Sequence, residues 1–191
     1  MKKNLITAFL MTIATTILLG IVYPLVVTAI SQVLFKAKAN GQIISRNGEA
    51  IGSRIIAQPF IGAKYFHPRP SAAGSGYDAA NSAGTNYAST NQKLIDRVRA
   101  DAETLQKENP SAPIPVDMLT TSASGLDPEV SPAAAEFQIP RVARERGISE
   151  SVLRDLVQKH TVQRDLGLLG EPRVNVLELN LALDDMASPG H

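Results

Sequence analysis

The stretch NLITAFLMTIATTILLGIVYPLVVTAISQVLF, residues 4–35, decides the architecture because it contains no charged residue. About 20 apolar residues are enough for a helix to cross the hydrocarbon core of a membrane. A secretory signal peptide has a shorter apolar core, about 7–15 residues, followed by a cleavage site between small residues. Residues 37–39, Ala-Lys-Ala, resemble such a site, so a cleaved signal is the alternative. The length of the apolar run favours an uncleaved transmembrane helix.

Basic residues flank both ends of this predicted span and nearly balance one another. Residues 1–3 read MKK, and Lys36 and Lys38 follow the span. The two sides of the span therefore carry nearly equal numbers of basic residues, and the positive-inside rule favours neither orientation. A short basic tail in front of a first span usually stays inside, so we predict a cytoplasmic tail at residues 1–3 and an extracytoplasmic domain at residues 36–191. The protein is then a single-pass protein of the cytoplasmic (inner) membrane.

Small or weakly polar residues recur at every fourth position of the span. In a helix, residues four apart lie on neighbouring turns of one face. Such a row lets the backbone of another helix come close, and threonine hydroxyls can donate hydrogen bonds across the contact. The alternative is a chance pattern, since these residues are common in membrane helices. We predict a helix-packing face made of Ala8, Thr12, Thr16, Gly20, Pro24 and Thr28.

The span is expected to be an anchor and a packing surface. Pro24 lacks a backbone donor and clashes with the preceding turn, so the Tyr23-Pro24 pair predicts a kink. No Asp, Glu, Lys, Arg or His lies within residues 4–35. A lone helix without such groups cannot form an ion pathway by itself.

Composition excludes several classes of function. The 191 residues carry 19 Lys and Arg against 18 Asp and Glu, a net charge of +1. This balance argues against a nucleic-acid partner, because nucleic-acid-binding proteins show a basic patch or stripe. The chain has no Cys, which excludes thiolate zinc sites, disulfides and cysteine nucleophiles. Enough sequence follows the span for one domain with its own core.

Periodicity and turn signals predict both helices and strands after the span. Asn47-Gly48 between two β-branched runs is a strong hairpin signal. Ser131-Pro132 is typical of a helix start and Gly147 of a helix end. Strands and helices are interspersed without a regular βαβ repeat, so we predict an α+β domain. The expected elements are a hairpin at 42–58, helices at 91–108, 132–146 and 150–160, and strands at 114–121 and 173–183.

No catalytic or metal-binding constellation is recognisable in the sequence. The histidines His67, His160 and His191 show no metal-ligand spacing, and His67 is interpreted as a packed loop residue. The Gly-Ser-Gly at residues 74–76 lacks the Lys-Ser or Lys-Thr of a phosphate-binding loop, so a turn is the favoured interpretation. We therefore expect no enzyme activity and no metal or cofactor bound by this chain alone. An anchored hydrolase is the alternative.

The acidic residues also have ordinary structural interpretations. Asp78 and Asp127 lie in predicted loops, where the expected role is an Asx-turn. The pair at residues 184–185 would point to opposite faces of a strand, and we assign it to a solvated terminus. None of these carboxylates is expected to be catalytic.

The segment YFHPRPSAAGSGYDAANSAGTNYASTNQKL, residues 65–94, is rich in Gly, Ser, Ala and Asn but is punctuated by aromatic residues. A disordered linker would be poor in aromatic residues. Small residues between the aromatic ones allow close approach of the backbone. An ordered segment without catalytic residues suits recognition of a protein partner. We predict an interface that includes Tyr65, Phe66, Arg69, Tyr77, Asn86 and Tyr87.

Several blocks of the chain resemble a known family. They are FHPRPSAAGSGYDAANSAGTNYASTNQ, then TTSASGLDPEVSPAAAEFQIPRVA at residues 120–143, the single amino-terminal span and the ending RVNVLELNLALD. Together they resemble the C subunit of the Kdp-type high-affinity potassium-transporting ATPase of bacteria. The resemblance covers most of the chain and departs locally at Glu129, where the family often has His.

The resemblance implies an accessory, non-catalytic subunit of an ATP-driven potassium uptake complex, needed for its assembly and activity. The implied partners are a potassium-translocating pore subunit, a P-type ATPase subunit and a small single-span subunit. ATP, magnesium and potassium would be bound by the complex. The C subunit of the family is described as a catalytic chaperone that raises the affinity of the ATPase subunit for ATP.

That description conflicts with a domain outside the membrane, which cannot touch cytoplasmic ATP. An effect on nucleotide would then have to act as a coupling free energy between distant sites. The alternative is direct contact with ATP, for which Gln138 and the turn at residues 74–76 are the candidates. We favour the outer location because the sequence has no nucleotide-binding motif.

Overall fold

The structure, a computed structural model, describes residues 1–187 and divides into two compact units. The first unit is Met1–Ile51, and the second begins at Gly52. His191 lies outside the described residues. Each unit is described by itself below.

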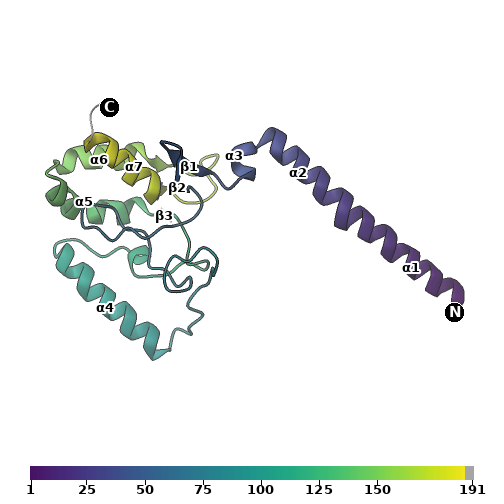
Figure 1. The fold of residues 1–191 in the computed structure, drawn as a ribbon. Coiled ribbons are helices and arrows are strands. Elements are labelled where there is room, and N and C mark those ends of the chain that lie inside the picture. The colour runs from purple at the N-terminus through teal and green to yellow at the C-terminus, as the bar shows by residue number, and fades with distance from the viewer. Residues whose placement is uncertain (188–191) are drawn as a thin grey trace. The chain divides into compact units, whose positions relative to one another are not determined.

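The first unit is dominated by one long apolar helix, Lys2–Leu34 (Figure 1). It consists of α1 (Lys2–Ile17), the π-helical segment η1 (Leu18–Val22) and α2 (Tyr23–Leu34). None of its residues is buried, and it is long and apolar enough to cross a membrane. The predicted span at residues 4–35 is therefore present as a continuous helix that ends one residue earlier.

The π-helical segment lies directly before Pro24. Pro has no N–H to donate, and its ring crowds the carbonyl four residues earlier, which is that of Gly20. The backbone responds with a wider turn, in which the Tyr23 N–H donates to the Leu18 carbonyl five residues back. At the Tyr23-Pro24 pair, where a kink was predicted, the structure has this π-helical turn.

A hairpin follows the helix. After α3 (Lys36–Ala39), strands β1 (Ile43–Arg46) and β2 (Glu49–Ser53) pair around the turn. Asn47 and Gly48 both have positive φ, 53° and 83°, as a two-residue turn of this kind requires. The predicted hairpin is confirmed, although its second strand stops at Ser53 and does not reach residue 58.

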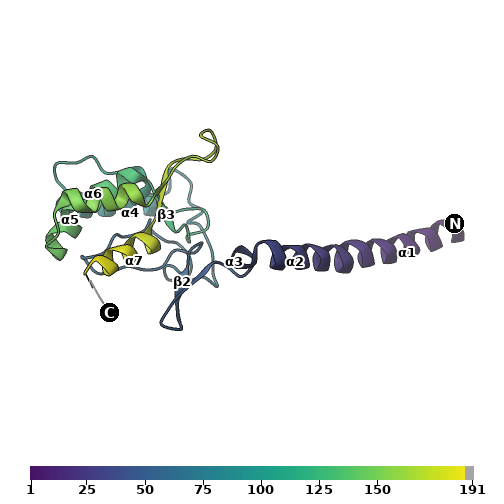
Figure 2. The same ribbon diagram turned by 90° about the horizontal axis from the view of Figure 1, so that it is seen from above.

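The second unit combines helices with a small antiparallel sheet, which agrees with the predicted mixture of helices and strands (Figures 1 and 2). The sheet order is β3-β5-β4, with Glu129 opposite Asn175 and Thr161 opposite Val174. The elements are α4 (Gln92–Glu108), the 3-10 helix η2 (Val116–Met118), β3 (Glu129–Val130), α5 (Pro132–Arg146), α6 (Glu150–Lys159), β4 (Thr161–Val162), β5 (Arg173–Asn175) and α7 (Val176–Ala187).

The predicted helices at residues 91–108, 132–146 and 150–160 are present as α4, α5 and α6. Asn91 accepts a hydrogen bond from the Lys93 N–H before α4, and Ser131 accepts one from the Ala134 N–H before α5. Gly147 ends α5 in the left-handed conformation, with φ 64°. The third helix, α6, begins after Ser149 as expected, but this serine makes no capping hydrogen bond.

The predicted strand at residues 173–183 is wrong. Only β5 is extended, and α7 starts at Val176. The Asn175 side chain accepts a hydrogen bond from the Glu178 N–H, which is the contact of a helix N-cap. The apolar pattern of residues 173–183 fits the period of a helix as well as that of a strand. Val176, Leu179 and Leu183 lie on one helical face and are buried there.

The predicted strand at residues 114–121 is also wrong. The structure has the short 3-10 helix η2 there, with Pro115 in extended conformation before it. Proline cannot donate to a strand ladder, so a proline at this position opposes strand pairing. Thr120 instead donates its hydroxyl to the Val116 carbonyl at 2.9 Å.

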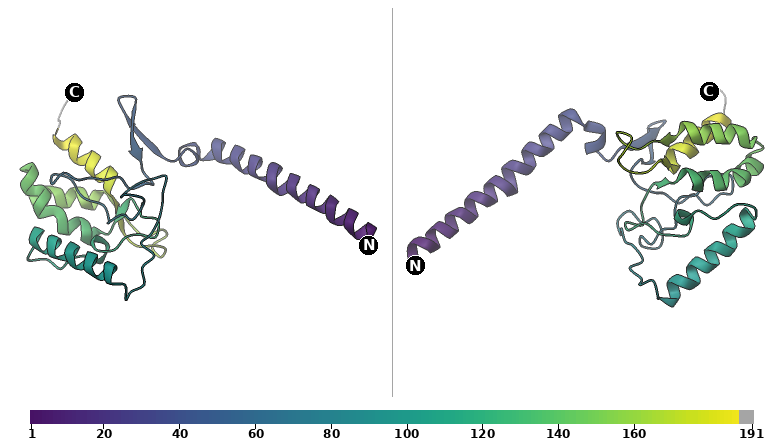
Figure 3. Two further views of the ribbon diagram at one scale, coloured as in Figure 1. Left: turned by 60° about the horizontal axis from the view of Figure 1, so that its bottom comes forward. Right: turned by 180° about the vertical axis from the view of Figure 1, so that it is seen from behind.

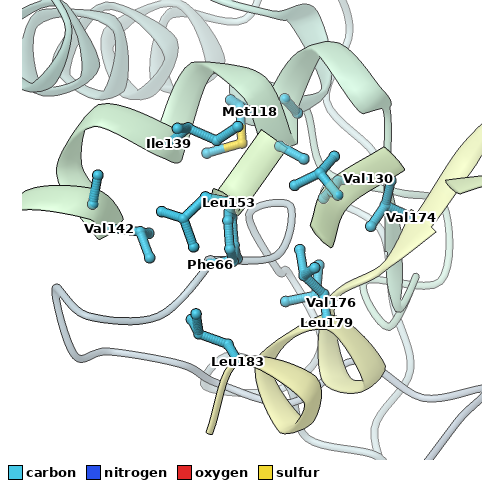
Figure 4. Packing of buried hydrophobic residues seen from close by; sticks show 14 residues of the cluster. Phe66, Met118, Val130, Ile139, Val142, Leu153, Val174, Val176, Leu179 and Leu183 are labelled. Atoms are coloured by element: carbon cyan, nitrogen blue, oxygen red, sulfur yellow. The ribbon is translucent and has the colours of Figure 1, made fainter. Parts of the chain in front are cut away.

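The core lies between α5, α6, α7 and the sheet (Figure 4). Phe66, from the long loop before α4, is fully buried among these elements. Its neighbours in the buried cluster include Met118, Ile139, Val142, Leu153, Val174, Val176, Leu179 and Leu183. A loop residue therefore forms part of the core, and this fixes the loop's position.

Candidate functional site

Two buried side-chain amides hold the loop at Phe66 and His67. Asn180, on α7, accepts from the Phe66 N–H at 2.9 Å and donates to the Phe66 carbonyl at 2.9 Å. Gln138, on α5, accepts from the His67 N–H at 2.7 Å and donates to the His67 carbonyl at 3.1 Å. These contacts satisfy backbone groups that have no strand or helix to pair with.

Arg141 adds a charged clamp one helical turn from Gln138. Its Nε donates to Glu108 at 2.7 Å, and its guanidinium also donates to the carbonyls of Ala63 and Tyr65. The Arg141 side chain is only 7% exposed. A buried guanidinium is tolerated when its donors are matched by acceptors, as they are here. Arg141 thereby ties the loop, α4 and α5 together.

Tyr65 is held on the opposite side by α5 and α7. Its hydroxyl donates to Asp184 at 3.2 Å, and Arg146 pairs with the same carboxylate at 2.7 Å. The Arg146 guanidinium also lies over the Tyr65 ring, 4.8 Å from its centroid, as in a cation–π contact. The assignment of Asp184 to a solvated terminus is therefore wrong, because this residue is part of an ordered network.

The second half of the loop is fastened to residues 120–127. Arg69 pairs with Asp127 at 2.9 Å and also contacts Thr120. The Tyr77 hydroxyl donates to the Arg69 carbonyl at 2.8 Å, and the Ser71 hydroxyl donates to the Gly125 carbonyl at 2.6 Å. These contacts show an ordered loop, as predicted.

Gly125 is required for this close packing. Its φ is +66°, and a Cβ there would lie 2.5 Å from the Ala83 carbonyl oxygen and 2.7 Å from the Ala73 nitrogen. Both distances are too short for a side chain. Ala73 and Ala83, which Gly125 approaches, belong to the 65–94 segment, where close backbone approach was the predicted role of the small residues.

A groove of about 400 Å³ opens between this loop and α4. In Figure 1 and in the right view of Figure 3, loop segments separate most of α4 from α5, α6 and α7. Its last residue, Glu108, pairs with Arg141 of α5, and the helix has no buried residue. The groove has few polar groups, which come from His67, Tyr77, Asp101 and Thr104. Its apolar wall includes Phe60, Ile61, Pro68, Pro70, Leu105 and Met118.

The polar groups of the groove already have partners within the chain. His67 Nε2 lies 3.1 Å from the Gly62 carbonyl, which can only accept, so this nitrogen carries the hydrogen. Burial, followed by the nearby Arg141 charge, lowers the pKa of His67 and keeps the ring neutral. Burial raises the pKa of Tyr77, which stays a phenol. Asp101 pairs with Arg97 at 2.6 Å.

The groove combines an apolar wall with polar groups that are engaged within the chain. Within residues 1–187, no three His, Cys, Asp or Glu side chains come together as metal ligands. The neutral His67 donates its ring N–H to the Gly62 backbone carbonyl. An apolar groove whose polar groups already have hydrogen-bond partners can bind apolar side chains of another protein.

The structure separates the predicted interface residues into three groups by their burial. The prediction that Phe66 belongs to the interface has to be corrected, because its side chain is fully buried and offers no surface to a partner. Tyr65, Arg69 and Tyr77 are half-buried and hold the loop, whereas Asn86 and Tyr87 are exposed. Contact of Asn86 and Tyr87 with a partner stays a prediction.

The candidate nucleotide contacts have structural roles. Gln138 is fully buried, and both its amide oxygen and its amide nitrogen are engaged within the chain. The segment at residues 74–76 forms a turn, in which the Gly76 N–H donates to the Ala73 carbonyl at 2.8 Å. Asp78 and Asp127 form the predicted Asx-turns with the Ala80 and Glu129 N–H groups.

The predicted membrane packing face is exposed along its whole length. One expected donor is engaged within the helix, since the Thr12 hydroxyl donates to the Ala8 carbonyl at 2.9 Å. Gly20 has open space, because a Cβ there would have its nearest neighbour, a Thr16 methyl, at 3.8 Å. The row therefore remains available to a neighbouring helix.

The residues that fix the loop, Asn180, Arg141 and Arg146, were not singled out from the sequence. Asn180 has one recognisable signal, a polar residue inside the otherwise apolar run RVNVLELNLAL. A buried amide in such a run must find partners, and here they are the backbone groups of Phe66. The arginines carry no comparable signal, because exposed and buried arginines look alike in a sequence.

Comparisons with known proteins agree with the sequence resemblance. The family model KdpC, described as K+-transporting ATPase, c chain, matches residues 5–185. The chain is 70% identical over 184 residues to the Potassium-transporting ATPase KdpC subunit of Koribacter versatilis, covering 96% of this chain and 95% of that protein. It is 53% identical over 196 residues to the KdpC subunit of Rhodopseudomonas palustris, covering 96% and 98% respectively.

Proposed function

Because the chain belongs to the KdpC family, the c chain of potassium-transporting ATPases, we propose that it is the accessory, non-catalytic subunit of such a complex. In this proposal the helix Lys2–Leu34 anchors the chain in the inner membrane, and the domain lies outside it. The observation that carries the proposal is the clamped loop, whose polar groups are satisfied within the chain and whose apolar groove is open.

The proposed partners are a potassium-translocating pore subunit, a P-type ATPase subunit and a small single-span subunit. The long apolar helix would pack against a partner helix through the row that includes Gly20. The groove beside α4 would accept apolar side chains from a partner outside the membrane. Potassium, ATP and magnesium would be bound by the partners.

We further propose that any effect on ATP affinity is indirect. Gln138 could contact a nucleotide only by releasing the His67 backbone, which would leave buried polar groups unpaired. An outer domain would influence nucleotide binding through the partner subunits, as a coupling free energy. Direct contact with ATP is the alternative, and its only candidate side chain already has partners.

Three measurements test the proposal. The full-length chain, purified from membranes with a tag, should carry the other ATPase subunits with it, and deletion of the chain should abolish potassium-stimulated ATP hydrolysis. The purified full-length chain alone should bind no ATP in equilibrium dialysis. Recovery of the chain without other subunits would contradict the accessory role, and stoichiometric ATP binding would favour the alternative.

A further inference from the structure

The connection between β4 and β5 carries three leucines into solvent. The side chains of Leu166, Leu168 and Leu169 are 91%, 81% and 62% exposed. Figure 2 shows this yellow-green loop projecting away from the helices of the second unit. Exposed single apolar residues need no explanation, but a group of three at one tip marks an interaction site.

The tip is built as a hairpin. The Asp165 N–H donates to the Leu169 carbonyl at 2.8 Å, and the Leu169 N–H donates to the Asp165 carbonyl at 2.9 Å. Leu166 has a φ of 53°, a backbone conformation that bulky side chains rarely adopt. Strain of this kind persists where the surrounding structure imposes it, and it is concentrated at binding sites.

Ion pairs neutralise the base of the hairpin. Arg164 pairs with Glu171, and Arg173 pairs with Asp165 at 3.6 Å and with Glu129 at 3.2 Å. The basic side chains at the base thus have acidic partners within the same unit. An apolar tip above a neutral base has little attraction for an anionic surface.

These features favour a protein partner over a lipid surface. Segments that lie in the membrane interface carry Trp or Tyr, or basic residues that face the lipid. Residues 163–172 contain no aromatic residue and no Lys, and their one Arg is paired. A tip held in one conformation is suited to a shaped pocket, because little ordering entropy is lost on binding.

We propose that the leucine tip, Leu166, Leu168 and Leu169, inserts into an apolar pocket on the extramembrane part of another subunit of the ATPase. This inference rests on the proposed function, because it names a docking element for the same assembly. The tip would act as a small central anchor, in which buried leucines supply most of the affinity at that contact.

Photo-crosslinking in the intact complex tests the proposal directly. Leu168→p-benzoylphenylalanine is introduced into the full-length chain, and the membranes are irradiated. We expect a crosslink to another subunit of the ATPase, identified by mass spectrometry. A crosslink only to lipid, a crosslink to a second copy of this chain, or no crosslink in a correctly assembled complex would each overturn the proposal. The same substitution at Val152, which is exposed on α6, is the positional control.

A variant series measures the contribution of the tip. The triple variant Leu166→Ser, Leu168→Ser, Leu169→Ser should fold normally, because these side chains are exposed, and its affinity for the other subunits should fall about tenfold or more. The matched triple Leu→Met variant keeps the apolar surface and should retain assembly. Unchanged affinity of the serine variant would overturn the proposal. If the unmodified chain recovers no subunits at all, the proposed function fails instead.

Discussion

The Asn180 side chain pairs with both backbone polar groups of Phe66, accepting from its N–H and donating to its carbonyl, each at 2.9 Å. The two residues are 114 positions apart in the chain. This contact links α7 to the loop before α4 and holds the aromatic ring of Phe66 in the core. This buried amide is therefore one of the contacts that fix the position of the candidate site, beside those of Gln138 and Arg141.

Replacing Asn180 with alanine should destabilise the protein strongly. The change leaves the N–H and C=O of Phe66 buried without partners, which costs about 1–3 kcal/mol for each group. We expect the free energy of unfolding to fall by about 3 kcal/mol. Chemical unfolding of the full-length chain in detergent measures the difference. The exposed Asn81 serves as control, since Asn81→Ala should change the stability by less than about 0.5 kcal/mol.

Removing the Arg69 side chain should loosen the second half of the loop. Arg69 pairs with Asp127 and contacts Thr120, and its side chain is 24% exposed. We expect Arg69→Ala to lower the free energy of unfolding by about 1–2 kcal/mol and to reduce assembly with the partner subunits. Arg99→Ala is a matched control, because Arg99 is 66% exposed and its ion pair is 4.0 Å long. Normal assembly and transport by Arg69→Ala would refute the role in docking.

Enlarging Gly20 should weaken association within the membrane without disturbing the chain itself. A side chain at Gly20 meets open space in this structure, so Gly20→Leu should leave the isolated helix intact. It should prevent the close approach of a neighbouring helix. Co-purification of the pore subunit is the measurement, and Ile21→Leu, off the small-residue row, is the control. Equal recovery of the pore subunit with the two variants would indicate that the row of small residues arose by chance.

Stability should depend on pH through His67. Burial lowers the folded-state pKa of His67 below its unfolded value of 6.5, with a second contribution from Arg141. The unfolded state therefore binds more protons as pH falls below about 6.5, and the free energy of unfolding decreases. The stabilising effect is fully present above the unfolded pKa and is lost as pH falls through the folded pKa.

The measurement is thermal unfolding of the full-length chain between about pH 5 and pH 8, a range in which histidine is the side chain that normally titrates. The His67→Asn variant should lose part of the pH dependence seen in the parent chain. His160→Asn is the control, because His160 lies at the end of α6, away from the groove residues. The same slope in the parent and the His67 variant would contradict the prediction.

Elements with local signals were predicted well. The apolar run, the Asn47-Gly48 turn and the Ser131-Pro132 helix start depend on neighbouring residues, and each is present. The helix α7 was missed because leucines at alternate positions satisfy the strand period while the buried positions follow the helix period. The capping contact of Asn175 decides between them, and a cap is a weak signal beside a run of leucines.

The sequence by itself determined the long apolar helix, the mixture of helices and strands and the family, because apolar length, turn residues and motif order are properties of neighbouring residues. Only the tertiary structure decided that Phe66 is core, that Gln138 holds a backbone segment, and that three leucines stand exposed at one tip. The physical reason is distance along the chain. A buried amide is satisfied by whatever polar group the fold brings to it, and in this protein that group lies 71 or 114 residues away.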